Sequence, residues 1–349
     1  MVDIRIDMKE LERLDKFQES RLLMRWAPRL YFHPHNSWYP IDLDVYVENC
    51  HGLTREGERI AEAGTLTWDE IARREGTDEA IEALDIDDDW LNANRGVKKN
   101  LRAYGIAGRM SEGHIVLCYP IFYAENPNVP VALIFGAGYH KADLEFVYFI
   151  LDSTGEELHW AYMTAHGSME HSLVPARDLM CNGLEVLNVP FLSTPDRLQL
   201  APGQAAPEGD CRPSVFVALN SHAMFWRPGT HWRIFGVTAD ICSADGPMLD
   251  LAEEDMLHVM NLDKDPIFKY TGRMGDTGVA SFAGRRLSIS LMHTYPASTA
   301  SGRQFFFGFV HPPVGFFTLG VLASIMVAAA ALFSYVKFIK SDQCKNGSV

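Results

Sequence analysis

The residues that offer the most chemistry lie in one short segment, Gly138-Tyr-His-Lys-Ala-Asp-Leu-Glu145, directly before the apolar run Phe146–Leu151. That run predicts a strand. Residues i and i+2 of an extended chain share a face, so we expect Asp143 and Glu145 to point the same way, with His140 closing over them. Two adjacent carboxylates repel unless they share a proton or a cation. Oxygen donors with one imidazole suit Ca²⁺, Mg²⁺ or Mn²⁺ better than structural zinc.

Two further histidines and an aromatic cluster extend this candidate site. His222 follows an apolar run in Leu219-Asn-Ser-His-Ala223, and we expect it to join His140, Asp143 and Glu145 as a metal ligand. We expect His166, Trp226 and Arg227 to contact a bound sugar or head group. The alternative is that the carboxylates face solvent on an edge strand, the histidines are satisfied polar residues, and the aromatic residues pack in the core.

Most of the elements that would position these residues are strands. Short runs of β-branched and aromatic residues, each bounded by turn residues, predict a mostly antiparallel sheet or sandwich. These runs are Ile115–Tyr119, Val131–Phe135, Phe146–Leu151 and Ser214–Leu219, and Leu287–Leu291 alternates as a last strand would. Pro195–Pro213 predicts a long loop. The fold class is therefore mainly β (α+β), a β-sandwich core with helical insertions.

Two stretches of the sequence predict helices. Apolar residues recur at helical spacing between Met8 and Trp26, ahead of Pro28. From about 53 to 105 the sequence is acidic and helical, which predicts a surface insertion. Within it, Thr67–Glu70 resembles a capping box and Asp85–Asp89 a solvated turn.

The C-terminal part of the chain predicts a membrane anchor. No Asp, Glu, Lys or Arg lies between Arg303 and Lys337. About 20 apolar residues in a helix cross the hydrocarbon core of a bilayer. We therefore expect one domain over 1–303, a transmembrane anchor over 304–340 and a short polar tail over 341–349. The alternative for the apolar stretch is a buried core helix.

Charge and cysteine content bound the partners and the compartment. The formal net charge of −14 argues against nucleic acid as a partner. Six scattered cysteines form no Cys-x-x-Cys pair and favour mostly reduced thiols, with a Cys181–Cys211 bridge as an open alternative. Lysines in the tail favour a cytosolic tail, whereas the acidic N-terminus is unlike a secretory signal and favours a cytosol-facing domain. Our expectation leans towards the cytosol-facing domain.

Four ordered segments resemble the vacuolar protein sorting-associated protein 62 family. They are Arg25–Pro34 with Trp38-Tyr-Pro40, Tyr119–Asn126, His140-Lys-Ala-Asp-Leu-Glu145 and Val215–Ala223. The third is similar to the family's His-x-Gly-Asp-Trp-Glu signature, and the fourth to its VYVAxGSHA strand. Ala142 and Asn220 stand where these signatures have Gly, and Leu144 stands where the first has Trp.

The same His-Asp-Glu segment is similar to the heptapeptide of the necrosis- and ethylene-inducing-like toxins. That resemblance implies a β-sandwich in which such residues bind a divalent metal beside a sphingolipid head-group site. Ala142 replaces the second histidine of the heptapeptide, which leaves a bound ion in place as an expectation and argues against toxin activity.

Three functions follow from these patterns. The first is a non-enzymatic, membrane-anchored module that uses a divalent ion to bind a lipid or glycan head group or a partner protein, in membrane traffic or in a membrane-bound assembly such as a virion. The second is a metal-dependent hydrolase of phosphoester or glycosidic bonds, with Glu145 or Asp143 as the base. The third is a structural scaffold without a metal. We expect the first.

Overall fold

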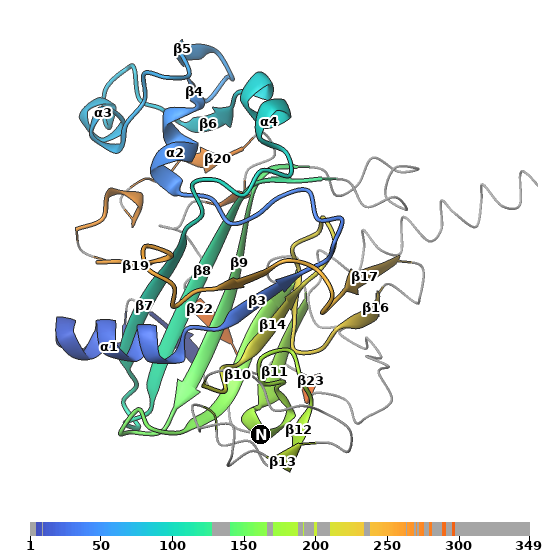
Figure 1. Cartoon of the computed structure of the whole chain (residues 1–349). Coiled ribbons are helices and arrows are strands. Elements are labelled where there is room, and N and C mark those ends of the chain that lie inside the picture. Colours follow the sequence, from blue (N-terminus) through green and yellow to red (C-terminus); the bar gives the residue numbers. More distant parts are fainter. Residues whose placement is uncertain are drawn as a thin grey trace, which may run out of the picture. The chain divides into compact units, whose positions relative to one another are not determined.

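The structure of the chain is a computed structural model (Figure 1). It describes residues 5–8, 10–127, 140–165, 170–187, 191, 199–200, 210–233, 238–262, 264–268, 270, 272–275, 279–280, 288–290 and 295–296. All of them belong to the unit Met1–Gln304. The predicted strand Val131–Phe135, the predicted anchor over 304–340 and the tail over 341–349 lie outside the described residues. Within the described part of the chain, no helix has the length and apolar character needed to cross a membrane.

The largest sheet has the strand order β19-β7-β8-β9-β10-β11-β23, with β2 paired to β7. Its strands are β2 (Glu12–Arg13), β7 (Ala103–Arg109), β8 (Ile115–Asn126), β9 (His140–Leu151), β10 (Leu158–Ala165), β11 (Glu170–Pro175), β19 (Leu257–Val259) and β23 (Tyr295–Pro296). From β7 to β11 each strand pairs antiparallel with the next. Every residue of β8, and every residue of β9 after the first, is buried. Burial on both faces explains why these strands read as nearly continuous apolar runs.

A second sheet, in the order β15-β14-β3-β18, covers part of the first. It consists of β3 (Arg29–Phe32), β14 (Ser214–Val217), β15 (Met224–Phe225) and β18 (Met248–Asp250), with β14 parallel to β3. One apolar cluster joins Phe32 and Val217 of this sheet to Tyr119 and Phe149 of the large one. The core is therefore mainly β and lies between two sheets, as the strand pattern predicted.

The first helix, α1 (Lys16–Trp26), packs beside β7. Asp15 caps it by accepting a hydrogen bond from the Gln18 amide at 2.9 Å, and Leu22, Leu23 and Trp26 form its buried face. The predicted helix over Met8–Trp26 was too long at its N-terminal side. Capping by Asp15 sets the start, and Glu12–Arg13 instead extend along β7 as β2.

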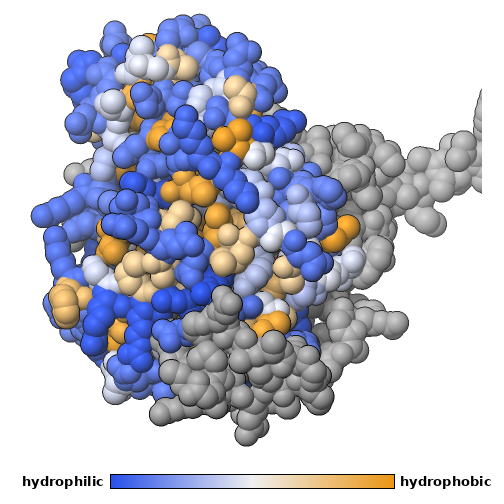
Figure 2. Space-filling model, in the orientation of Figure 1, coloured by the Kyte–Doolittle hydropathy of each residue, from blue (hydrophilic) through white to orange (hydrophobic). Residues whose placement is uncertain are grey.

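The insertion before β7 forms a lobe of mixed α/β structure at one end of β8 and β9 (Figure 1). It contains α2 (Leu43–Glu48), β4 (Cys50–Leu53), β5 (Arg59–Ala61), α3 (Trp68–Arg74), β6 (Ala83–Ile86) and α4 (Asp88–Asn94). The distant strands β20 (Arg273–Met274) and β21 (Val279–Ala280) complete its sheet, in the order β21-β20-β6-β4-β5. The prediction of a helical insertion was therefore wrong in part, since three of its segments pair as strands. In Figure 2 the lobe, at the top of the view, presents a mainly hydrophilic surface.

Smaller elements complete the described chain. Three two-stranded sheets pair β1 (Arg5–Asp7) with β22 (Ser288–Ser290), β12 (Val186–Leu187) with β13 (Gln199–Leu200), and β16 (Gly229–Arg233) with β17 (Thr238–Cys242). Two single turns of 3₁₀ helix are η2 (Ala176–Asp178) and η5 (Pro266–Phe268). Cys181 and Cys211 form a disulfide, whereas Cys50, Cys118 and Cys242 are free and buried. The structure therefore contains the Cys181–Cys211 bridge that the sequence left open, and the three other described cysteines are free thiols.

Candidate functional site

The candidate site lies where β8 ends and β9 begins, at the end of the large sheet beside the insertion lobe. The antiparallel register sets Tyr123 opposite Asp143 and Ile121 opposite Glu145. Cross-strand partners share a face, so Asp143 and Glu145 lie on the same side of β9, as their spacing predicted. Both residues are buried: Asp143 is 4% exposed and Glu145 is 1% exposed.

His222 reaches this face from the turn that follows β14. Its Nδ1 atom lies 3.1 Å from Oδ2 of Asp143, although the two residues are 79 positions apart in the chain. The turn holds both Asn220 (φ 63°) and His222 (φ 54°) in the left-handed region. His222 is fully buried. The structure therefore brings together two of the four predicted metal ligands.

The electrostatics around His222 favour a neutral ring in which one nitrogen, Nε2, has no hydrogen-bond partner among the described residues. Burial lowers the pKa of His222 below its ordinary value, and the hydrogen bond that the ring makes to Asp143 opposes that shift only in part. A neutral ring that donates from Nδ1 to Asp143 carries its lone pair on Nε2, an assignment that rests on this hydrogen bond. Nε2 is buried and has no hydrogen-bond partner among the described residues.

The ring of Tyr123 stacks on His222, with the ring centres 3.8 Å apart and the planes at 6°. The Tyr123 hydroxyl is likewise buried without a hydrogen-bond partner in the described part of the chain. Burial, with the nearby carboxylates of Asp143 and Glu145, raises the pKa of Tyr123 well above its ordinary value. The hydroxyl therefore stays protonated and can donate to an incoming oxygen.

The two other buried carboxylates at this end of the sheet have strong donors. The Thr164 hydroxyl of β10 donates to Oε2 of Glu145. Glu125 accepts from Trp38 Nε1 at 2.6 Å and from Arg95 Nη2 at 3.0 Å. Arg95 is half exposed, whereas the Glu125 side chain is almost fully buried. Charge-assisted hydrogen bonds of this kind compensate the burial of a carboxylate.

His140 is held at the start of β9. Its Nδ1 atom lies 2.7 Å from the carbonyl oxygen of Ala142, and its Nε2 atom lies 3.2 Å from the side-chain amide of Asn126. His140 also acts on His222 electrostatically, and lowers the pKa of that ring. His140 is thus close to the pair but engaged through both ring nitrogens.

The insertion lobe contacts the strand that carries the site. Lys141 Nζ lies 2.9 Å from Asp85, 2.7 Å from Asp88 and 2.9 Å from the Ile86 carbonyl oxygen. Burial acts to lower the pKa of Lys141, but Asp88 and Asp85 raise it overall. The prediction of a solvated turn over Asp85–Asp89 was therefore wrong in part. Asp88 and Asp89 are exposed, but Asp85 and Asp88 hold the lobe against β9 through Lys141.

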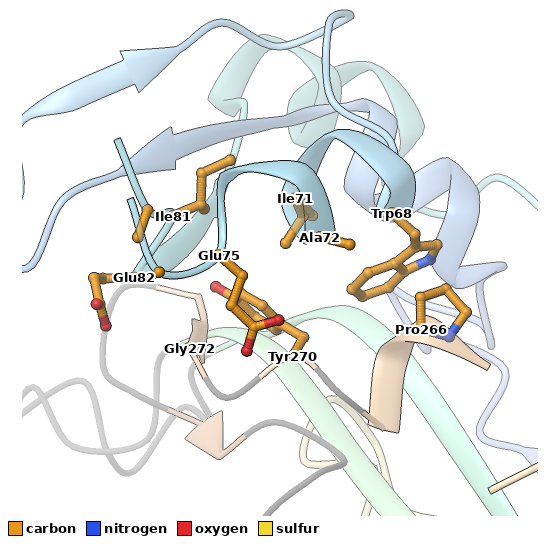
Figure 3. Close-up of a pocket in the computed structure, with 11 residues that line it drawn as sticks. Trp68, Ile71, Ala72, Glu75, Ile81, Glu82, Pro266, Tyr270 and Gly272 are labelled. Atoms are coloured by element: carbon orange, nitrogen blue, oxygen red, sulfur yellow. The ribbon is translucent and has the colours of Figure 1, made fainter. Parts of the chain in front are cut away.

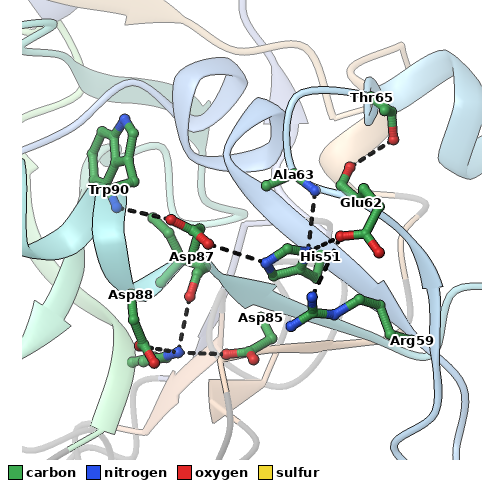
Figure 4. Close-up of polar contacts among 11 residues, drawn as sticks. His51, Arg59, Glu62, Ala63, Thr65, Asp85, Asp87, Asp88 and Trp90 are labelled. Carbon is green, nitrogen blue, oxygen red and sulfur yellow. Dashed lines mark hydrogen bonds and ion pairs between the residues drawn. The ribbon is translucent and has the colours of Figure 1, made fainter.

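A second polar cluster, centred on His51, connects elements within the insertion lobe (Figure 4). His51 is almost buried, and its Nε2 lies 3.2 Å from Asp87, which also caps α4 through the Trp90 amide. On the other side of the ring, Nδ1 lies 3.1 Å from the Ala63 amide and 3.2 Å from Glu62. These contacts join β4, the turn after β5 and the start of α4.

The remaining predicted site residues lie as follows. Trp226 is partly buried and packs against the core, with its ring 6.2 Å from that of His231. Arg227 pairs with Glu185 at 3.4 Å. His166 lies outside the described residues. Among the side chains that the structure describes, no three from His, Cys, Asp or Glu are arranged to hold a metal ion.

Sequence reasoning missed Tyr123, Glu125 and Lys141 as members of this site. The signal for the first two was present: they alternate along the run that ends at Asn126, and an antiparallel partner for the His140–Glu145 strand would place them beside its acids. Lys141 gave no such signal, because its partners lie in another lobe.

Comparison with known proteins gives only distant likenesses. No protein-family model and no curated protein matches the sequence. Among solved structures, a triple mutant of NLPPya aligns at 10% identity and a TM-score of 0.32, over 71% of this chain and 76% of that one. NLPPya in complex with glucosamine aligns at 14% identity and a TM-score of 0.28, over 58% of this chain and 75% of that one. Necrosis and Ethylene inducing Protein 2, from the causal agent of cocoa's Witches Broom disease, aligns at 12% identity and a TM-score of 0.26. The alignment covers 60% of this chain and 79% of that one. Likeness at this level assigns no ligand or activity to this chain.

Proposed function

We propose that this domain is a non-enzymatic binding module whose centre holds a divalent ion, Ca²⁺, Mg²⁺ or Mn²⁺. The ion would organise a site for a lipid or glycan head group, or for a partner protein. The observation that carries the proposal is the buried pair of His222 and Asp143, in which the second ring nitrogen has no described partner. An unpaired buried polar atom is costly, so such an atom calls for an explanation.

The donor chemistry of this centre fits an ion. Histidines that bind metals commonly donate their other ring N–H to a carboxylate, as His222 does to Asp143. Burial keeps the ring neutral, which is the ligating form. His222 would bind the ion through Nε2, and Asp143 would hold the ring from Nδ1. Glu145 and His140 would supply further donors in exchange for their present hydrogen bonds, and the ion would offer a coordination position to a ligand oxygen.

Backbone geometry supports the proposed kinship with the vacuolar protein sorting-associated protein 62 family. Two departures from the family signatures, Ala142 and Asn220, replace glycine. Both have φ in the left-handed region, at 62° and 63°. Glycine is the residue that adopts this region without strain, so the backbone has the form that the family's glycines would favour.

We place this module at a membrane, in membrane traffic or in a membrane-bound assembly such as a virion. The support is the uncharged stretch between Arg303 and Lys337, which is long enough for a transmembrane anchor. Trp226, Arg227 and His166 remain our candidates for contacts to the head group, since arginine and tryptophan are suited to such polar, partly apolar ligands.

The ion is tested by the melting temperature of the full chain in detergent, first with EDTA and then with Ca²⁺, Mg²⁺ or Mn²⁺. An ion at one hundred times its Kd adds about 2.7 kcal/mol to the free energy of unfolding, which raises the melting temperature by several degrees. We expect His222→Asn and Asp143→Asn to lose this rise. His159→Asn, which changes a partly exposed histidine of β10, should keep it. A wild-type protein that does not respond to any ion contradicts the proposal.

A further inference from the structure

A cleft in the insertion lobe, separate from the site on β8 and β9, has the chemistry of a binding site of its own (Figure 3). It lies between α3 and the segment that follows η5, and its volume of about 320 Å³ is in the range of small-ligand pockets. Its lining includes Trp68, Ile71, Glu75, Ile81, Glu82 and Tyr270. None of these residues takes part in the site around His222.

Two aromatic rings form one corner of the cleft. The rings of Trp68 and Tyr270 lie 6.1 Å apart with their planes at 61°. Trp68 Nε1 donates to Asp44 at 2.9 Å, and the Tyr270 hydroxyl donates to the Arg273 carbonyl oxygen at 3.0 Å. The polar edges of both rings are therefore engaged and their orientations fixed, which leaves apolar, electron-rich surface for a ligand.

The charged side chains among the described lining residues, Glu75 and Glu82, are both acidic. Figure 3 shows the Glu75 carboxylate beside the ring of Tyr270, with Glu82 further along the rim. Both glutamates are exposed, and no described residue forms a hydrogen bond or ion pair with either carboxylate. The C-terminal end of α3 adds partial negative charge, because Glu75 is its C-cap.

The two arginines of α3 that precede Glu75 are paired with another glutamate. Arg73 and Arg74 of α3 both bind Glu70, the former through Nη2 at 2.7 Å and the latter through Nε at 2.7 Å. Glu82 acts to raise the pKa of Tyr270, and Arg273 acts to lower it, so both charges lie near this ring. A monovalent cation with an apolar body is the ligand that matches two aromatic faces, aliphatic side chains and an unpaired carboxylate.

We propose that this cleft binds a small organic cation, an alkylated ammonium group with no anionic group next to it. Its alkyl surface packs on Trp68, Ile71 and Tyr270, and its charge faces Glu75. The proposal is independent of the divalent ion, because the two sites share no residue.

Calorimetric titration of the full chain with choline chloride tests this proposal. We expect saturable binding, at least tenfold weaker binding of 3,3-dimethyl-1-butanol, which has the same shape without the charge, and weaker binding of phosphocholine. Glu75→Gln should weaken choline binding about tenfold. Glu56→Gln, which changes another exposed carboxylate, on the β4–β5 turn, should not alter choline binding.

Melting temperatures of both variants establish that they are folded. Neither substitution removes a hydrogen bond or ion pair to a described residue. Absence of choline binding at millimolar concentration overturns the proposal. So does equal binding of the neutral analogue, or unchanged binding by Glu75→Gln. Tighter binding of phosphocholine than of choline overturns the requirement for a cation without a neighbouring anion.

Discussion

At the scale of single residues, the strained positions gather at the candidate site. Ala142, Asn220 and His222 have φ between 54° and 63°, and the other non-glycine residues with positive φ in the described part of the chain are Asn100, Asn182 and Asp255. Asparagine, aspartate and histidine are the residues other than glycine found most often in this region, whereas alanine adopts it at a cost of roughly 1–2 kcal/mol. Strain of this kind tends to accumulate where function requires a particular geometry.

Replacement of Ala142 by glycine should relieve part of this strain. We expect Ala142→Gly to raise the free energy of unfolding by up to about 1 kcal/mol, because the gain at φ 62° exceeds the loss of one buried methyl group. Ala124→Gly is the matched control: this alanine is equally buried on the paired strand β8 and has no positive φ. It should destabilise by about 1 kcal/mol.

Urea unfolding of the two variants measures both effects. If Ala142→Gly destabilises as much as Ala124→Gly does, the backbone at position 142 carries no strain, and the argument from the family's glycine is wrong.

The sequence predicted the residues of the site better than their contacts. The common face of Asp143 and Glu145 follows from the two-residue period of a strand, and it is confirmed. The contact of Asp143 with His222 was proposed only through a shared ion, since no local rule relates residues 79 positions apart. The hydrogen bonds of His140 depend on the left-handed turn at Ala142, and alanine gives no sequence signal for that conformation.

At the scale of elements, the turn between β9 and β10 fixes α1 on the large sheet. The indole of Trp26 donates to the Gly155 carbonyl oxygen at 3.0 Å, and Arg25 pairs with Glu156 at 2.6 Å. Asp152 organises this turn. Its partial burial acts to raise its pKa, but hydrogen bonds from the Thr154 hydroxyl and from three backbone amides lower the pKa of Asp152 to about 2. The turn is therefore a packed junction.

The packing around this turn leaves no room for a side chain at Gly155. Gly155 has φ +79°, and a methyl group there would lie 2.8 Å from Cδ2 of the fully buried Leu22. We expect Gly155→Ala to cost roughly 2–4 kcal/mol, from the left-handed backbone and from overpacking. Gly113, with φ +92° and no contact closer than 3.7 Å, should show only the backbone part in Gly113→Ala. Chemical denaturation measures the difference, and equal costs for the two variants would show that Leu22 yields freely.

Elements with a strong local pattern were predicted well, and those that depend on distant partners were not. The centres of β8, β9 and β14 were predicted, since their apolar runs are buried along their length. Thr67 caps α3 through the Glu70 amide, as its capping-box pattern indicated. The sheet of the insertion lobe was missed because β4, β5 and β6 are only three or four residues long, too short for a clear alternating pattern. In addition, β6 pairs with β20, almost two hundred residues later in the chain.

At the scale of the whole molecule, the disulfide bears on the compartment that the proposed membrane-anchored domain would occupy. A Cys181–Cys211 bridge closes a loop of 30 residues. Structural disulfides persist in oxidising compartments and are rare in the cytosol. The bridge therefore favours a domain outside the cytosol, which is also the orientation that the tail lysines favour, and it opposes our expectation of a cytosol-facing domain.

Alkylation of the denatured protein, isolated from cells in the presence of a thiol-blocking reagent, tests this orientation. We expect two more thiols to react after reduction than before, and Cys181→Ser with Cys211→Ser to abolish the difference. In sealed membranes, protease added from the cytosolic side should leave the domain intact. Equal thiol counts before and after reduction, or rapid cytosolic digestion of the domain, would restore the cytosol-facing orientation.

The ring nitrogens of His222 test the central claim most directly, because the proposed ion needs an unprotonated Nε2. The measurement is the ¹⁵N spectrum of the full chain with labelled histidine, in which the His222 resonances are identified by their loss in His222→Asn. We predict an unprotonated Nε2 at pH 7 without metal, and paramagnetic broadening of His222 and His140 ahead of the other histidines when Mn²⁺ is added up to one equivalent. A protonated Nε2, or a His222 signal that persists while other histidines broaden, would contradict an ion at this centre.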